Sequence, residues 1–187
     1  LWAPSENSLI DRDLDADSLN FFPVQDRWAA LSRTVYAGAE YSDRGQFRME
    51  TNFLVFSQSE LAGYNFDPLA MARAAVASGY LRLRPALTTK LPPLWLPESL
   101  GEAPPPPDQS QQMPALIREI LGRYAEERLV VVGCLQPRTL LRQIFDCLAP
   151  QERLGLSFST GLKPSTHRPF RLQFLPQVNN ELARELQ

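Results

Sequence analysis

The clearest alternation of apolar and polar residues lies over residues 47–56, and it predicts a strand with one face packed on a core. The positions on that face are Phe47, Met49, Thr51, Phe53 and Val55. Leu54 and Phe56 break the alternation, so we expect the far end of this strand to be covered on both faces. Residues 27–36 contain neither Gly nor Pro and predict a second strand. A loop over residues 37–46 would join the two as an antiparallel hairpin, after a short strand over residues 20–24.

A helix is predicted to begin after Asp67, whose side chain can cap the free amides at a helix start. Pro68 suits the first helical position because the missing amide proton has no role there. Residues 69–78 are rich in alanine, and Gly79 can adopt the left-handed conformation that ends a helix.

The C-terminal half alternates helical and strand patterns. The predicted elements are helices over residues 113–127 and from Pro137, and strands over residues 129–133, 154–160 and 170–175. The order strand, helix, strand over residues 129–160 favours a right-handed parallel crossover. The last two strands would form a hairpin across a turn at residues 161–168.

Proline separates the two halves: residues 85–114 hold nine of the 17 prolines, which blocks regular helix. The tetraproline at residues 104–107 is typical of a linker, although a Pro-rich groove ligand is the alternative. We expect residues 1–187 to form a single α+β domain with a mixed sheet. Its parts would be residues 20–84, the Pro-rich crossing at 85–114, and residues 115–178.

Charge and composition narrow the function classes. The net charge is −2, without the basic excess typical of a nucleic-acid partner. The longest apolar run is strand-sized, so no membrane association is predicted. The N-terminal Leu-Trp-Ala-Pro does not have the pattern of a signal peptide, and the chain can be a fragment of a longer one. The only two cysteines, Cys134 and Cys147, predict buried thiols in a reducing compartment.

Few side chains carry candidate chemistry, and we predict no catalytic, cofactor or metal site. His167 is the only histidine and stands among cations, which favours a solvated turn residue over a catalytic base. Cys134 precedes a predicted helix start, so a nucleophilic thiol paired with His167 is the enzymatic alternative. A packed core thiol is the interpretation that we favour.

A basic cluster on two predicted loops is the most distinctive polar feature. Its members are Arg44, Arg48, Lys163, His167, Arg168 and Arg171. If the loops share one end of the sheet, the cluster can bind a phosphate or an acidic partner surface. Ordinary solvated charges are the alternative, which we favour. Core packing is likewise the interpretation that we favour for the large aromatic residues, with partner binding as the alternative. These residues are Phe21, Phe22, Trp28, Phe53 and Trp95.

Three stretches carry a family resemblance: residues 27–45, Thr51-Asn52-Phe53-Leu54-Val55, and residues 154–176 with the phrase Ser-Phe-Ser-Thr-Gly-Leu-Lys at 157–163. They resemble planctomycete-type bacterial proteins and, more distantly, the GTPase-associated protein family of bacterial conflict systems. The resemblance covers about residues 20–178. It implies a cytoplasmic accessory domain acting as an adaptor near a GTPase, with no established reaction. Relatives often carry a histidine near Asn52, which this chain lacks.

We therefore expect a non-enzymatic interaction domain with a protein partner, of undetermined oligomeric state. Two alternatives stay open. One is an enzyme of unusual type that uses Cys134 or the basic cluster, and the other is a purely structural domain of a longer chain.

Overall fold

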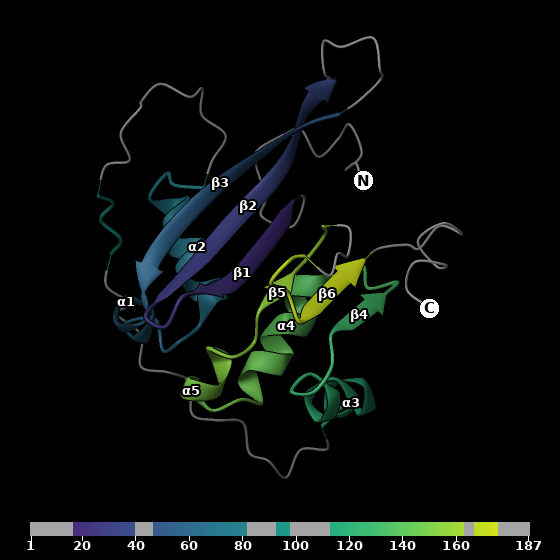
Figure 1. Ribbon diagram of the computed structural model, residues 1–187. Coiled ribbons are helices and arrows are strands. Elements are labelled where there is room, and N and C mark those ends of the chain that lie inside the picture. The colour runs from purple at the N-terminus through teal and green to yellow at the C-terminus, as the bar shows by residue number, and fades with distance from the viewer. Residues whose placement is uncertain (1–16, 40–46, 82–92, 98–112, 163–166, 176–187) are drawn as a thin grey trace.

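The computed structural model describes residues 17–39, 47–81, 93–97, 113–162 and 167–175. The strands are β1 (Ser18–Val24), β2 (Trp28–Ala39), β3 (Phe47–Ser57), β4 (Leu129–Val132), β5 (Phe158–Ser159) and β6 (Leu172–Leu175). The helices are α1 (Gln58–Ala62), α2 (Pro68–Ala77), α3 (Ala115–Arg123), α4 (Pro137–Asp146) and α5 (Pro150–Arg153). The strands form one mixed sheet in the order β3-β2-β1-β5-β6-β4, so the α+β prediction is confirmed (Figure 1).

The N-terminal strands form an antiparallel meander. β2 and β3 pair from Trp28 opposite Ser57 to Tyr36 opposite Met49, which confirms the predicted hairpin. β1 adds to the other edge of β2, also antiparallel. The helix α1 follows β3 directly, because Ser57 and Glu60 form a capping box in which each side chain bonds the other's backbone amide.

The C-terminal strands are parallel, and the predicted hairpin between the last two strands is wrong. β6 pairs in parallel with β5 on one side and with β4 on the other. Adjacent parallel strands cannot be joined by a tight turn, because the chain must first travel back along the sheet. That return falls between β5 and β6, where the structure describes residues 160–162 and 167–171. β4 and β5 do run in the same direction, as the crossover predicts, but β6 lies between them.

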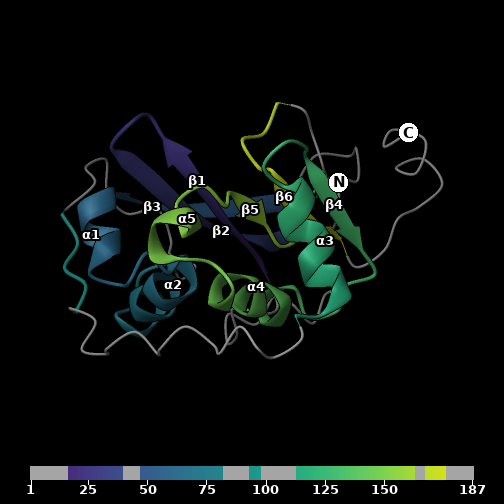
Figure 2. The ribbon, with the colours of Figure 1, turned by 90° about the horizontal axis from the view of Figure 1, so that it is seen from below.

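The helices α2 and α4 lie together on one face of the sheet, as Figure 2 shows, and we call this the core face. Phe158 on β5 is fully buried there, with its ring 6.0 Å from Phe21 of β1 and 6.0 Å from Phe145 of α4. Ile117 and Ile120 bring α3 into the same core. Burial of these large side chains is the main stabilising term. No described helix combines the length and the apolarity that a bilayer crossing requires.

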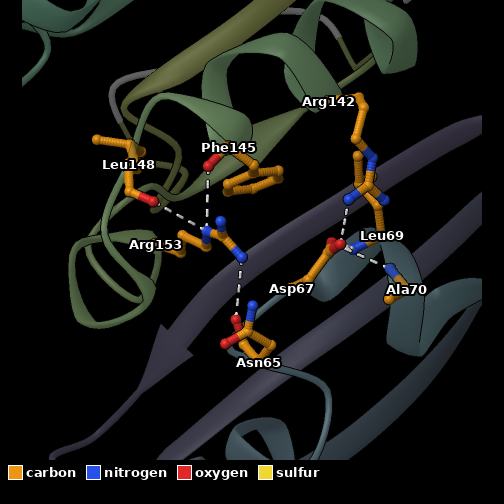
Figure 3. Close-up of polar contacts among 8 residues, drawn as sticks. All are labelled: Asn65, Asp67, Leu69, Ala70, Arg142, Phe145, Leu148 and Arg153. Carbon is orange, nitrogen blue, oxygen red and sulfur yellow. Dashed lines mark hydrogen bonds and ion pairs between the residues drawn. The ribbon is translucent and has the colours of Figure 1, made fainter. Parts of the chain in front are cut away.

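Two arginines of the C-terminal half fasten it to the N-terminal half (Figure 3). Asp67 caps α2 as predicted, accepting bonds from the amides of Leu69 and Ala70, and it also pairs with Arg142 of α4. Arg153 of α5 donates to the carbonyl oxygen of Asn65 at 3.1 Å. The Arg153 guanidinium bonds two further carbonyls within its own half, those of Phe145 and Leu148. The single-domain prediction stays a prediction, but these bonds and the shared sheet join both halves.

The face of β3 that packs on the core is the opposite of the one predicted. Leu54 and Phe56 are the residues buried in the core, whereas Phe53 and Val55 are 59% and 56% exposed. The pattern correctly separates two faces but does not determine which of them meets the helices. The N-terminal half therefore has an apolar strand surface turned away from its own core.

Candidate partner-binding groove

The face of the sheet opposite α2 and α4, here called the outer face, carries exposed aromatic and branched side chains. Trp28 on β2 is 46% exposed and lies at one end of this face, opposite Ser57 and diagonal to Val55 of β3. Core packing was therefore the wrong interpretation for Trp28 and Phe53, and also for Trp95, which is 84% exposed. Of the five aromatic residues that we expected to pack in the core, only Phe21 is fully buried there. Exposed apolar residues clustered on one face are typical of a binding surface.

A row of polar side chains crosses the middle of the outer face. The register places Phe53, Ser32, Asn20, Ser159, Gln173 and Val130 side by side on successive strands. The four polar members of this row are buried. The Asn20 amide donates to Ser32 Oγ at 3.1 Å, and Ser159 Oγ accepts from the amide of Leu162 at 3.2 Å. The bonds of Asn20 and Ser159 help to hold the strands in one register, whereas the side-chain oxygen of Gln173 is buried without a hydrogen-bond partner.

The return segment, residues 160–171 as far as the structure describes them, lies against this outer face. Thr160 extends the pairing of β1, since its amide donates to the Leu19 carbonyl and its hydroxyl accepts from the Leu19 amide. At the other end, the ring of Phe170 meets that of Phe22 edge to face, with centroids 5.7 Å apart. Figure 2 shows the stretch just before β6 on the side of the sheet away from α2 and α4. The parallel pairing of β5 and β6 thus gives the outer face a partial second layer.

A groove of about 310 Å³ lies where the return segment meets the antiparallel strands. Its floor comes from β1, β2 and β3, and its wall comes from the return segment. The described lining residues are Phe22, Ser32, Thr34, Met49, Thr51, Phe53, Leu162, Arg168, Pro169 and Phe170. Both halves of the chain are therefore needed to form the groove, and its surface is mostly apolar.

Hydroxyl groups supply polar atoms on the floor. Thr34 Oγ1 and Thr51 Oγ1 are 3.0 Å apart in one hydrogen bond, which uses the proton of one hydroxyl. Ser32 Oγ accepts from Asn20 and so retains its own proton for donation. Two hydroxyl protons can consequently point to a ligand's acceptor atoms.

Arg168 provides the positive charge of the groove wall. It is partly buried, and this burial lowers the pKa of its guanidinium from the ordinary value. A carboxylate in the groove would favour the charged form and offset that desolvation. A guanidinium has five N–H donors in a planar fork, enough to bind a ligand oxygen alongside contacts within the protein.

The structure separates the members of the predicted basic cluster. Arg168 lines the groove, whereas Arg171 donates to the Ala125 carbonyl just after α3. His167 is exposed on the return segment. Arg44, Lys163 and the tetraproline lie outside the described residues, and the side chain of Arg48 is not described. A shared anion site for the whole cluster stays a prediction.

Cys134 and His167, which the enzymatic alternative would pair, differ in burial. Cys134 is half-buried against the core, while His167 is exposed. Cys147 is also half-buried, and burial, followed by the charge of Asp146, raises the pKa of its thiol. Among the described residues, no group of three or more His, Cys, Asp or Glu side chains is placed to hold a metal ion.

Sequence reasoning named two groove aromatics, Phe22 and Phe53, only as an alternative to core packing. It gave no role to the hydroxyl residues of the floor. The sequence does place Ser, Thr and Met residues on the same sheet face as Phe53. These residues predict a groove only when the return segment is known to lie over that face.

The chain forms an α+β domain whose mixed sheet is covered by helices on one face and carries the groove on the other. The family model of the GTPase-associated protein 1, N-terminal domain type 2, matches residues 2–96, and the chain belongs to this family. The matched region contains β1, β2 and β3, hence the floor of the groove, whereas its wall comes from beyond residue 96. Neither a curated protein nor a solved structure matches the chain.

Proposed function

We propose that this chain is a non-enzymatic protein-interaction module whose groove binds an apolar side chain next to a carboxylate on a partner protein. The observation that carries the proposal is the groove itself. It joins aromatic rings, an arginine and hydroxyl donors on the sheet face that no described helix covers.

The size of the groove favours recognition of a side chain over binding of a large cofactor. Its volume of about 310 Å³ is at the lower end of the range for ligand sites. Phe22, Phe53 and Phe170 offer apolar contact area, and Arg168 with the hydroxyls of the floor offers donors for a carboxylate. An acidic residue beside a large apolar residue has the matching chemistry.

The character of the lining supports a binding role. The described lining residues include no histidine, cysteine or carboxylate that could activate one of the hydroxyls. Such a surface can bind and orient a partner without changing it.

The family description makes a GTPase the candidate partner. We place the complex in the bacterial cytoplasm, where the module would act as an adaptor that holds the GTPase near a second component. The test is binding of a purified GTPase from the same genome, loaded with GDP or with a non-hydrolysable GTP analogue, by biolayer interferometry.

Two groove variants and one matched control make this test specific. Phe53→Ser removes apolar contact and Arg168→Gln removes the charge, and each should weaken binding roughly tenfold or more. Leu135→Ser changes a residue that is 84% exposed just after β4, and it should bind as the native chain does. Absence of binding in both nucleotide states would exclude the GTPase, and equal binding by all three variants would exclude the groove.

A small probe tests the groove chemistry without the GTPase. We expect 3-phenylpropionate to shift the amide resonances of groove residues, whereas 3-phenylpropionamide, which lacks the charge, should shift them several-fold less at equal concentration. Equal shifts from both compounds would remove the role assigned to Arg168.

A further inference from the structure

The outer edge of β3 is a free strand edge within the described part of the chain. β3 pairs with β2 on one side, and no described strand lies on its other side. A strand edge presents a row of backbone amides and carbonyls that a further strand can pair with, and natural proteins usually protect such edges with charge, proline or a covering segment.

The N-terminal part of this edge has the charged residues Arg48 and Glu50, whereas its C-terminal part carries none of the usual protection. Residues 51–57 contain no charged residue, no proline and no glycine, and they include Phe53, Leu54, Val55 and Phe56. On the outer face, Phe53 and Val55 are more than half exposed directly beside the edge. Such a stretch has high affinity for another strand.

The stretch is also complementary to itself in the antiparallel direction. If Leu54 of one copy lies opposite Leu54 of a second copy, Phe53 faces Val55 and Thr51 faces Ser57. Each of these two pairs occurs twice because of the two-fold axis and lies on the outer face, while Leu54 meets Leu54 and Asn52 meets Phe56 on the core face. On the outer face, apolar side chains then meet apolar side chains and hydroxyls meet hydroxyls, and no like charges come together.

We propose that two copies of this chain associate through their β3 edges, forming a continuous sheet across an antiparallel pair centred on Leu54. A single strand pair buries less area than the roughly 1,600 Å² of a standard interface, so the dimer forms reversibly. It places two grooves on the same side of one sheet, which gives the assembly two partner sites. The proposal does not depend on which ligand the groove binds.

Sedimentation equilibrium over a wide concentration range tests the dimer. The native chain should change from the monomer mass of 21.1 kDa to twice that mass as the concentration rises. Val55→Lys places a lysine opposite Phe53 at both symmetric positions and should raise the dissociation constant at least tenfold. Leu135→Lys adds the same charge at an exposed apolar position away from β3 and should dimerise as the native chain does.

Hydrogen exchange at low and high protein concentration identifies the surface. Amides of β3 should become more protected as the dimer forms, and those of β4, the opposite edge strand, should not. A native chain that stays monomeric up to about 0.5 mM would overturn the proposal. A dimer that Val55→Lys leaves intact, or protection confined to β4, would also overturn it.

Discussion

The two faces of the sheet use similar side chains for different purposes. On the core face, Phe21 and Phe158 lie under α4 with almost no exposed area. On the outer face, Phe53 and Val55 are more than half exposed, and the described cover consists of residues of the return segment that line the groove. Exposed apolar side chains contribute little to folding, so the comparison separates the residues expected to stabilise this domain from those proposed to bind a partner.

The largest effect should come from truncating the core face. Phe158→Ala removes a fully buried ring that packs on Phe21 and Phe145, and it should lower the free energy of unfolding by about 4 kcal/mol. The matched change Phe53→Ala on the outer face should cost less than about 1 kcal/mol, because the ring is largely exposed. Urea unfolding followed by circular dichroism measures both, and equal losses would remove the distinction between the faces.

Two neighbouring polar residues of β2, Arg33 and Thr34, should also differ in how much they contribute to stability. Arg33 and Asp17 form an ion pair whose side chains are only 2% and 1% exposed, and Arg33 also donates to the Leu81 carbonyl at 2.9 Å. Arg33→Met leaves the Asp17 carboxylate buried without its counter-charge and should cost about 3 kcal/mol.

The neighbouring residue Thr34 provides the control for Arg33. Thr34→Val removes only the hydroxyl bonded to Thr51 and should cost about 1 kcal/mol. If both variants unfold at the same urea concentration, the buried pair has no special part in stability.

A smaller effect should follow at the junction of the two halves. Asp67→Ala removes both the cap of α2 and the contact with Arg142, and should cost about 2 kcal/mol. Arg142→Met removes only the second of these and should cost about 1 kcal/mol. A loss from Arg142→Met larger than that from Asp67→Ala would show that the contact between the halves outweighs the helix cap.

The smallest effect concerns pH. Burial raises the pKa of the Cys147 thiol in the folded state, so its contribution is fully present below the unfolded thiol pKa of about 8.5 and is lost as the pH rises above it. The stability of the native chain should therefore fall slightly more than that of Cys147→Ser between pH 8 and pH 10. Parallel curves for the two proteins would contradict the shift.

The sequence predicts the elements better than their arrangement. The Asp67-Pro68 start of α2 and the β2–β3 hairpin are local patterns, and both are confirmed. The direction of β6 is not local, because it depends on whether residues 160–171 turn or travel back across the sheet. Alternation in β3 likewise shows two faces but not which one the helices cover, since that depends on where α2 and α4 pack. The groove could not be predicted, because it depends both on the direction of β6 and on which face of β3 the helices cover.

Nuclear Overhauser contacts test most directly whether the return segment crosses the outer face. The structure predicts contacts between the ring protons of Phe22 and Phe170, whose centroids are 5.7 Å apart. It also predicts the parallel register in which Phe158 lies beside Leu172 and Ser159 beside Gln173. Antiparallel α-proton contacts between β5 and β6, without any contact between Phe22 and Phe170, would contradict the groove and the function proposed for it.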